Sequence, residues 1–221
     1  MKTKLHSLYA ALAVLFVMSL VATAHAQAGV NGVSDELAIG ASMPLSDHVM
    51  MNIDGSKFTL NGHNGDQGLL VIFSCNTCPF VVGNGEKSEG WEGRYNALNE
   101  AANAAGINMV LVNSNEAKRQ GDDSFRAMQK HAEIAGYTMP YVVDAGHQVA
   151  DAFGARKTPH VYLFNTEGRL MYRGAIDDNV RTAKKVAENY LLDAIEAVGN
   201  GQKAELTETP ALGCSIKRLG S

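Results

Sequence analysis

A continuous apolar run at residues 69–73 is followed, one residue later, by Cys75-Asn76-Thr77-Cys78-Pro79. The run has the length of a fully buried strand, and a proline is tolerated in the first turn of a helix. The sequence therefore predicts a strand-to-helix junction with two cysteines on one face, close enough to form a disulfide. We expect Cys75 at the helix N-terminus, where free N–H groups favour a thiolate. Cys75 is thus the predicted nucleophile, and the deeper Cys78 is the predicted resolving thiol.

Three other interpretations of this cysteine spacing are weaker. A zinc site needs four ligands, and the remaining cysteine, Cys214, is remote in sequence. Haem attachment requires a histidine after the second cysteine, where Pro79 stands. A structural disulfide usually closes a longer loop. Reversible redox chemistry is favoured, and we predict neither a metal ion nor another cofactor.

The N-terminus has the pattern of an export signal, with Lys2 and Lys4 before an apolar stretch and Ala24-His25-Ala26 at its end. The apolar stretch is shorter than the ~20 residues of a confident membrane span. We expect export to a periplasm or outside the cell, where an odd number of cysteines favours thiol chemistry. The predicted organisation is a signal peptide at 1–26, a flexible leader at 27–40, one folded domain at 41–200 and a tail at 201–221 that contains Cys214.

The formal net charge of the chain is −4, and it becomes more negative when the two lysines leave with the signal. An acidic balance disfavours nucleic acid and anionic membranes as partners. The expected partners are protein or small-molecule disulfides and thiols, together with a membrane-bound or soluble thiol reductant. The sequence does not fix the oligomeric state.

Hydrophobic periodicity predicts strands alternating with helices. Asp54-Gly55 marks the turn of a first hairpin, and Glu167-Gly168 the turn of a second. Helix 122–135 is expected to be capped by Asp122 or Asp123, and helix 180–198 by Asp178 or Asn179. The elements predict a mixed α/β sheet with helices on both faces. The expected strands are 49–53, 57–60, 69–73, 107–112, 141–143, 161–164 and 170–173, and the expected helices are an interrupted one after the dithiol, then 91–105, 122–135, 149–153 and 180–198.

This order of elements resembles the thioredoxin superfamily, and more narrowly its peroxiredoxin-like, redoxin branch, with an N-terminal β-hairpin and a Cys-x-x-Cys-Pro site. The resemblance spans nearly the whole predicted mature chain. It rests on Cys75-Asn76-Thr77-Cys78-Pro79-Phe80, Val112-Asn113-Ser114-Asn115-Glu116, Met139-Pro140-Tyr141-Val142-Val143-Asp144, Ala152-Phe153-Gly154-Ala155, Thr158-Pro159, Tyr172-Arg173-Gly174-Ala175-Ile176-Asp177-Asp178 and Gly213-Cys214-Ser215-Ile216-Lys217.

The resemblance implies a thioredoxin-like α/β fold in which Cys75 and Cys78 are the redox pair. It also implies that Pro159 follows a cis peptide bond and faces this pair. The backbone of Thr158 would then be free to pair with an extended substrate. Cys214 is either a third redox thiol or a packed one, and the sequence does not choose.

Some family features are missing from the chain. The hydroxyl that polarises peroxide in peroxiredoxins is missing from its usual place before either cysteine, and residues 69–73 lack the buried acid of thioredoxins. Proton transfer during thiol exchange therefore needs another group or water. The glycine-rich segment 83–93 is expected as an insertion beside the site.

The sequence thus predicts an exported thiol-disulfide oxidoreductase that uses the dithiol. A thiol peroxidase and a non-enzymatic copper-binding or redox-sensing module remain as alternatives. His160 is expected near the dithiol, more often as an ordinary strand residue than as a ligand. Arg156 and Lys157 could lower the pKa of a thiol if they point at Cys75. Asp177 and Asp178 are better explained by a loop before the final helix than by paired acid chemistry.

Overall fold

The apolar run that precedes the dithiol forms the buried strand β3 (Gly68–Phe73), in which every residue is buried. The computed structural model describes residues 34–220. In it, β3 pairs in parallel with β4 (Ile107–Asn113) and antiparallel with β7 (His160–Asn165). Both faces of β3 are covered, which explains why its sequence is apolar without alternation.

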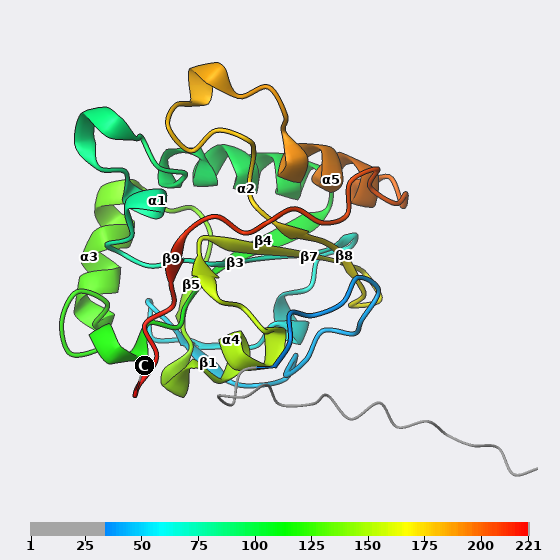
Figure 1. Cartoon of the computed structure of the whole chain (residues 1–221). Coiled ribbons are helices and arrows are strands. Elements are labelled where there is room, and N and C mark those ends of the chain that lie inside the picture. Colours follow the sequence, from blue (N-terminus) through cyan, green and yellow to red (C-terminus); the bar gives the residue numbers. More distant parts are fainter. Residues whose placement is uncertain (1–33, 221) are drawn as a thin grey trace, which may run out of the picture.

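Four further strands complete a seven-stranded sheet in the order β2-β1-β5-β4-β3-β7-β8 (Figure 1). The first predicted hairpin is confirmed as β1 (Met50–Asn52) with β2 (Lys57–Phe58). The second is confirmed as β7 with β8 (Leu170–Gly174). Strand β5 (Tyr141–Val143) joins β1 to β4. The sheet is mixed, as predicted.

Helices cover both faces of the sheet (Figure 1). One face carries α1 (Pro79–Val82), α2 (Tyr95–Ala104), α3 (Phe125–Ala135) and α5 (Tyr190–Gly199), with both cysteines of the dithiol in the same apolar cluster. The other face carries α4 (Gln148–Phe153). Short 3-10 turns lie at Asn61–His63, Gly85–Lys87, Glu92–Arg94, Glu116–Lys118, Ala145–His147 and Ala183–Lys185. The α/β prediction is therefore confirmed.

The sequence-based prediction places the start of the last helix ten residues too early. It begins at Tyr190 rather than at residue 180, and Asn189 precedes it. The proposed caps serve the preceding loop instead, because the Asp178 carboxylate accepts from the Ala187 N–H at 3.0 Å and the Asn179 amide oxygen accepts from the Thr182 N–H at 3.1 Å. Local hydrogen bonds from Asp and Asn thus compete successfully with helix formation.

The cap of α3 also differs from the prediction. Ser124 caps the helix by accepting from the Ala127 N–H at 3.3 Å, and Gly136 ends it in the left-handed conformation, as predicted. Neither Asp122 nor Asp123 is the cap. Asp123 is instead buried, where it takes part in the site described below.

Both ends of the described chain pack against the domain. The predicted signal at 1–26 lies outside the described residues, but residues 34–40 of the predicted flexible leader are held beside α4. The Ser34 N–H donates to the Asp151 carbonyl at 3.1 Å, and the Leu37 N–H donates to the Phe153 carbonyl at 3.0 Å. Within residues 34–220, no helix is both long and apolar enough to cross a membrane.

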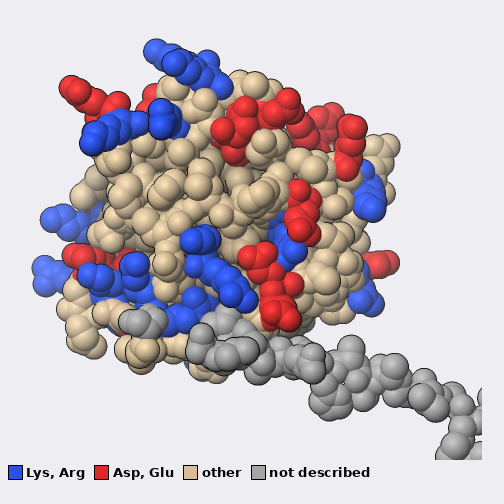
Figure 2. Space-filling model, viewed as in Figure 1, with Lys and Arg blue, Asp and Glu red and all other residues tan. Residues whose placement is uncertain are grey.

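The predicted tail after residue 200 belongs to the folded domain. It runs from α5 across the molecule to the side of α4, as the red segment of Figure 1 shows. On its way, β9 (Cys214–Ser215) pairs antiparallel with β6 (Lys157–Thr158) in a separate two-stranded sheet, and Ile216 is buried. On the face that it crosses, acidic side chains gather near α5 and basic side chains near the end of the tail (Figure 2).

Candidate active site

The two sulfurs of the dithiol lie where β3 meets α1, as predicted, but the helix begins later. Cys78 is the residue directly before α1, and Pro79 is the first helical residue. Cys75 precedes a bend at Asn76 and Thr77, so the expectation that Cys75 begins the helix is wrong. Both thiols are free and buried, with 2% and 4% of Cys75 and Cys78 exposed. Cys78 is therefore not the deeper of the two.

Thr158 contacts both sulfurs. The Cys75 thiol donates to the Thr158 hydroxyl at 3.3 Å, and the Cys78 sulfur lies 3.0 Å from the Thr158 carbonyl oxygen. The peptide bond between Thr158 and Pro159 is cis, as the resemblance implies. The structure thus brings together all four residues that the sequence places at the site.

The backbone of Thr158 is not free, which corrects another expectation. It pairs with Cys214 in the β6–β9 sheet, so the chain itself occupies the edge where a substrate was expected. Gly213 makes this approach possible, because a Cβ atom there would lie 2.3 Å from the Thr158 carbonyl oxygen. Cys214 is partly exposed and packs against the cluster that contains the dithiol.

The surroundings shift the pKa values of the two buried thiols in opposite directions. The hydrogen bond to Cys78, burial and the charge of Asp123 raise the pKa of Cys75. Interactions with the Cys75 side chain, with the thiol and N–H of Cys214 and with the N–H of Phe80 lower the pKa of Cys78 to about 5, against an opposing effect of burial. The Thr158 carbonyl can bond only to the thiol form of Cys78 and also opposes ionisation. The arrangement makes Cys78 the more readily ionised sulfur, because donors surround it.

Asp123 is the site residue that the sequence-based reasoning missed. Its carboxylate accepts from the backbone N–H of Asn76 at 2.9 Å and from the side-chain amides of Asn113 at 2.8 Å and Asn115 at 3.0 Å. It is fully buried and acts on Cys75. The acid that β3 does not supply therefore comes from the segment before α3. The two asparagines at and just after the end of β4, Asn113 and Asn115, were the available signal, because a buried carboxylate needs such donors.

Further hydrogen bonds from neighbouring elements fix the bend between the cysteines. The Tyr141 hydroxyl donates to the Asn76 amide oxygen at 2.9 Å, and the Asn76 amide donates to the Asp122 carbonyl at 2.7 Å. The Ser74 hydroxyl pairs with the Tyr95 hydroxyl at 3.1 Å. These contacts connect the cysteine segment to β5, α2 and the α3 segment, so the bend is held from three sides.

Other predicted candidates lie elsewhere. The His160 side chain lies on the same face of β7 as Tyr162, which is the face turned away from the dithiol. Burial there lowers the pKa of His160 to about 3. The charge that acts most strongly on Cys75 is that of Asp123, not that of Arg156 or Lys157.

The other acidic candidates do not form a paired acid site. Asp177 is buried and holds a loop by accepting from the Trp91 indole N–H at 2.8 Å and by pairing with Arg94. Among residues 34–220, no group of three or more His, Cys, Asp or Glu side chains is arranged to hold a metal ion.

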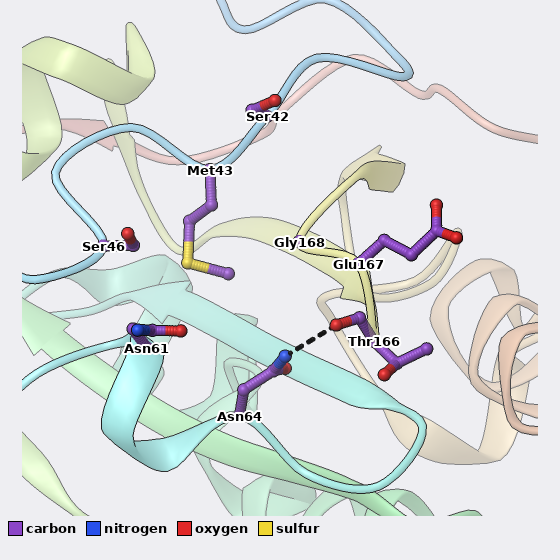
Figure 3. Close-up of a pocket in the computed structure, with 8 residues that line it drawn as sticks. All are labelled: Ser42, Met43, Ser46, Asn61, Asn64, Thr166, Glu167 and Gly168. Carbon is purple, nitrogen blue, oxygen red and sulfur yellow. Dashed lines mark hydrogen bonds between the residues drawn. The ribbon is translucent and has the colours of Figure 1, made fainter.

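Two cavities flank the sheet at opposite ends. One of about 580 Å³ begins beside Pro79 and Phe80, next to the dithiol, and extends to Val180 and Arg181. Another of about 260 Å³ is lined by polar residues such as Asn64 and Thr166, whose amide and carbonyl bond at 3.1 Å (Figure 3). The second cavity lies at the Gly68 end of β3, whereas the cysteines follow the Phe73 end. The first cavity thus begins at the two residues that follow Cys78, and neither cysteine of the dithiol lines it.

The redoxin family model matches residues 38–191, more than half of the chain. This chain belongs to the redoxin family. Redoxins are oxidoreductases, so the prediction of a redox enzyme is confirmed. Of the motifs quoted from the sequence, those that contain Cys75, Asn113, Tyr141, Thr158 and Cys214 fall on the segments that build the site of this redoxin.

Individual relatives agree with the family. Thiol-disulfide oxidoreductase ResA from Geobacillus thermodenitrificans is 25% identical over 134 residues, which are 61% of this chain and 67% of that protein. A solved structure of an uncharacterised conserved protein from Geobacillus kaustophilus has a TM-score of 0.74 at 30% identity, covering 83% of this chain and 94% of that one. A hypothetical protein from Sinorhizobium meliloti has a TM-score of 0.69 at 30% identity, covering 85% and 98%.

More distant structures show the fold alone. Peroxidoxin BcpB from Mycobacterium tuberculosis superposes with a TM-score of 0.53 at 12% identity, covering 75% of this redoxin and 98% of that chain. The predicted thioredoxin-like fold is confirmed.

Proposed function

We propose that this redoxin is a thiol-disulfide oxidoreductase in which Cys75 and Cys78 form a reversible disulfide. The observation that carries the proposal is the contact of both sulfurs with one residue, Thr158, at 3.3 Å and 3.0 Å, directly before the cis peptide bond. The similarity to proteins named thiol-disulfide oxidoreductase supports the same chemistry. Thiols and disulfides are accordingly the proposed substrates.

The structure favours Cys78 as the attacking sulfur, which reverses the order expected from the sequence. The attacking species in thiol exchange is the thiolate, and a sulfur with a low pKa is also the better leaving group. In the reducing direction, the Cys78 thiolate attacks a substrate disulfide and forms a mixed disulfide. Cys75 then attacks Cys78, the substrate thiolate leaves with a proton, and Cys75 and Cys78 become the protein disulfide. Asp123 stands close enough to influence the proton that Cys75 loses.

We also propose that the protein acts after export, since residues 1–26 have the pattern of a signal peptide. An oxidising compartment would supply disulfides as substrates. Fractionation of cells that express the full chain, followed by N-terminal sequencing of the mature protein, tests this part.

A redox titration tests the central proposal. The wild-type protein is equilibrated in buffers of oxidised and reduced glutathione, alkylated and mapped by mass spectrometry. We expect one two-electron couple that involves Cys75 and is lost in Cys75→Ser and in Cys78→Ser. Three thiols that stay reduced, or that pair only between molecules, would overturn the proposal.

A second measurement assigns the roles of the two sulfurs. The variants Cys75→Ser/Cys214→Ser and Cys78→Ser/Cys214→Ser each keep one buried cysteine, and each is mixed with dithiodipyridine at pH 6. We expect the variant that retains Cys78 to react at least tenfold faster, because the backbone N–H groups of Phe80 and of residue 214 remain as donors that favour its thiolate. A faster reaction at Cys75 would restore the order predicted from the sequence.

A further inference from the structure

Of the three cysteines, the two that carry the proposed disulfide are buried, whereas Cys214 is partly exposed. A protein dithiol must bring its own sulfur to bonding distance of the sulfur that it attacks, and an exposed sulfur allows this without rearrangement of the fold. The edge of Thr158, where an incoming chain could otherwise pair, is occupied by β9. The buried pair therefore has an accessible sulfur beside it that belongs to the same chain.

We propose that Cys214 is the sulfur through which protein dithiols exchange electrons with the buried pair, by way of a disulfide between Cys214 and Cys78. This inference rests on the proposed function and names its substrate class, a protein that carries a dithiol. It differs from the sequence-based expectation, which left Cys214 as either a redox thiol or a packed one.

The pairing of β9 with β6 places Cys214 directly next to Cys78. Cys214 is paired with Thr158, whose carbonyl oxygen lies 3.0 Å from the Cys78 sulfur. The Cys214 thiol and backbone N–H both interact with that sulfur. Cys78 thus lies between two possible partners, Cys75 on the buried side and Cys214 on the exposed side.

Contacts on the following residues hold this strand in place. The Ile216 N–H donates to the Arg156 carbonyl at 3.1 Å, and the Lys217 N–H donates to the Asn115 side chain at 2.8 Å. The Arg218 guanidinium pairs with Asp151 at 2.7 Å. Asn115 also holds Asp123, so the strand that carries Cys214 is tied to the acid beside Cys75. Cys214 is therefore held at the site by the contacts of its own strand.

The exchange needs no external oxidant. In the oxidised protein, the Cys214 thiolate attacks the sulfur of Cys78, the bond between Cys75 and Cys78 breaks, and the bond between Cys78 and Cys214 forms. Cys75 leaves and takes up a proton, which replaces the one that Cys214 lost. One disulfide replaces another, and the redox state of the protein is unchanged.

Reduction follows at the exposed sulfur. A thiolate of the partner attacks Cys214, and Cys78 leaves as a thiolate. The second thiol of the partner then attacks the mixed disulfide, and Cys214 leaves as a thiol. The partner dithiol has become a disulfide, and two electrons have passed to this protein. The departure of Cys78 is favoured because good leaving groups in thiol exchange have a low pKa.

The first test asks whether the second disulfide forms. Reduced Cys75→Ser is treated with one equivalent of diamide, quenched with acid, alkylated and mapped by mass spectrometry, and Cys78→Ser serves as the matched control. We expect a Cys78–Cys214 disulfide within single molecules of Cys75→Ser and none between Cys75 and Cys214 in the control. Only intermolecular disulfides in Cys75→Ser, or equal crosslinking in the two variants, would overturn the proposal.

The second test measures the route of the electrons. Oxidised wild type, Cys214→Ser and the neighbouring control Ser215→Ala are reduced either by reduced thioredoxin or by dithiothreitol. We expect Cys214→Ser to be reduced at least tenfold more slowly by thioredoxin and less than threefold more slowly by dithiothreitol, with Ser215→Ala unchanged. Unchanged reduction of Cys214→Ser by thioredoxin would overturn the proposal, as would equal slowing with both reductants, which indicates a damaged site.

These outcomes separate the inference from the function on which it rests. If wild type forms the Cys75–Cys78 disulfide but Cys75→Ser forms no disulfide with Cys214, the role of Cys214 fails and the oxidoreductase stands. If wild type forms no disulfide of Cys75 in glutathione buffers, the proposed function itself fails.

Discussion

The carbonyl oxygen of Thr158 lies 3.0 Å from the sulfur of Cys78. The same residue accepts from the Cys75 thiol through its hydroxyl and pairs through its backbone with Cys214. One residue thus positions all three cysteines, with its side chain serving one and its backbone the other two. This division allows the contribution of the side chain to be measured separately.

Replacing Thr158 with valine removes the hydroxyl and keeps the backbone and the shape. The Thr158 hydroxyl lowers the pKa of Cys75 by stabilising its thiolate. We expect Thr158→Val to slow alkylation of Cys75 by roughly threefold to tenfold, the effect of a single hydrogen bond, and to leave Cys78 unchanged. Iodoacetamide kinetics with peptide mapping measure both sulfurs, and Thr158→Ser should retain the wild-type rate.

The low pKa of Cys78 predicts how stability depends on pH in the reduced protein. The pKa falls from an ordinary 9.0 to about 5 on folding, so the thiolate stabilises the native state above pH 9, and this contribution is lost as the pH falls towards 5. Cys214 acts in the opposite sense, because burial and Cys78 raise its pKa to about 11, and its contribution is lost as the pH rises from 9 to 11. Urea unfolding of wild type and Cys78→Ser between pH 5 and 9 should show a difference that shrinks towards pH 5. A constant difference would contradict the assignment.

Asp123 is predicted to hold Cys75 in its thiol form as well as to stabilise the bend. Asp123→Asn removes a buried charge that accepts three hydrogen bonds. We expect a loss of roughly 1.5–3 kcal/mol in the free energy of unfolding and a lower pKa for Cys75. Denaturant unfolding and the pH dependence of Cys75 alkylation, in a background with Cys78→Ser and Cys214→Ser, measure the two effects. Asp122→Asn, next in sequence and exposed, is the control that should change neither.

Gly213 is predicted to tolerate no side chain. Gly213→Ala places a Cβ atom 2.3 Å from the Thr158 carbonyl oxygen and 2.7 Å from its carbon, so β9 must move away from β6. We expect a loss of about 1–3 kcal/mol, as in overpacked cores, and faster alkylation of Cys214. Gly93→Ala is the control, because its Cβ atom would meet nothing within 4 Å. Equal stability of the two variants would show that β9 is not held as described.

The glycine-rich segment after the dithiol depends on an ion pair between Arg94 and Asp177, both largely buried. Asp177→Ala leaves the Arg94 charge without its carboxylate, for which we expect a loss of about 3–5 kcal/mol. Glu208→Gln removes an exposed partner of Arg173 and should change stability by at most about 1 kcal/mol. Thermal or urea unfolding of the two variants compares a buried with an exposed pair.

The sequence predicts the fold well where the signal is local. The apolar run at 69–73 predicts a covered strand, and the turn residues Asp54-Gly55 and Glu167-Gly168 predict both hairpins. The helix that ends at Gly136 has a residue that readily adopts the left-handed conformation. Each of these features depends on neighbours within a few residues, so a pattern along the chain reveals it.

The errors concern contacts between distant segments. The start of α1 moved past Cys75 because the Asn76 N–H bonds to Asp123, which a helix-start rule cannot anticipate. Asp123 resembled a helix cap because aspartate is common both as a helix cap and as a buried acid. Strand β9 has only two residues, too few for any periodicity, and its partner Thr158 is far away in sequence. The occupied edge of Thr158 therefore became visible only in three dimensions.

Strand β9 follows every other strand along the described chain. During synthesis, a growing polypeptide carries Cys75 and Cys78 long before Gly213 has been translated. Throughout that interval the segment around both sulfurs lacks the strand that pairs with Thr158 in the finished molecule. Folding factors that meet the nascent protein therefore encounter a more open dithiol than later partners do.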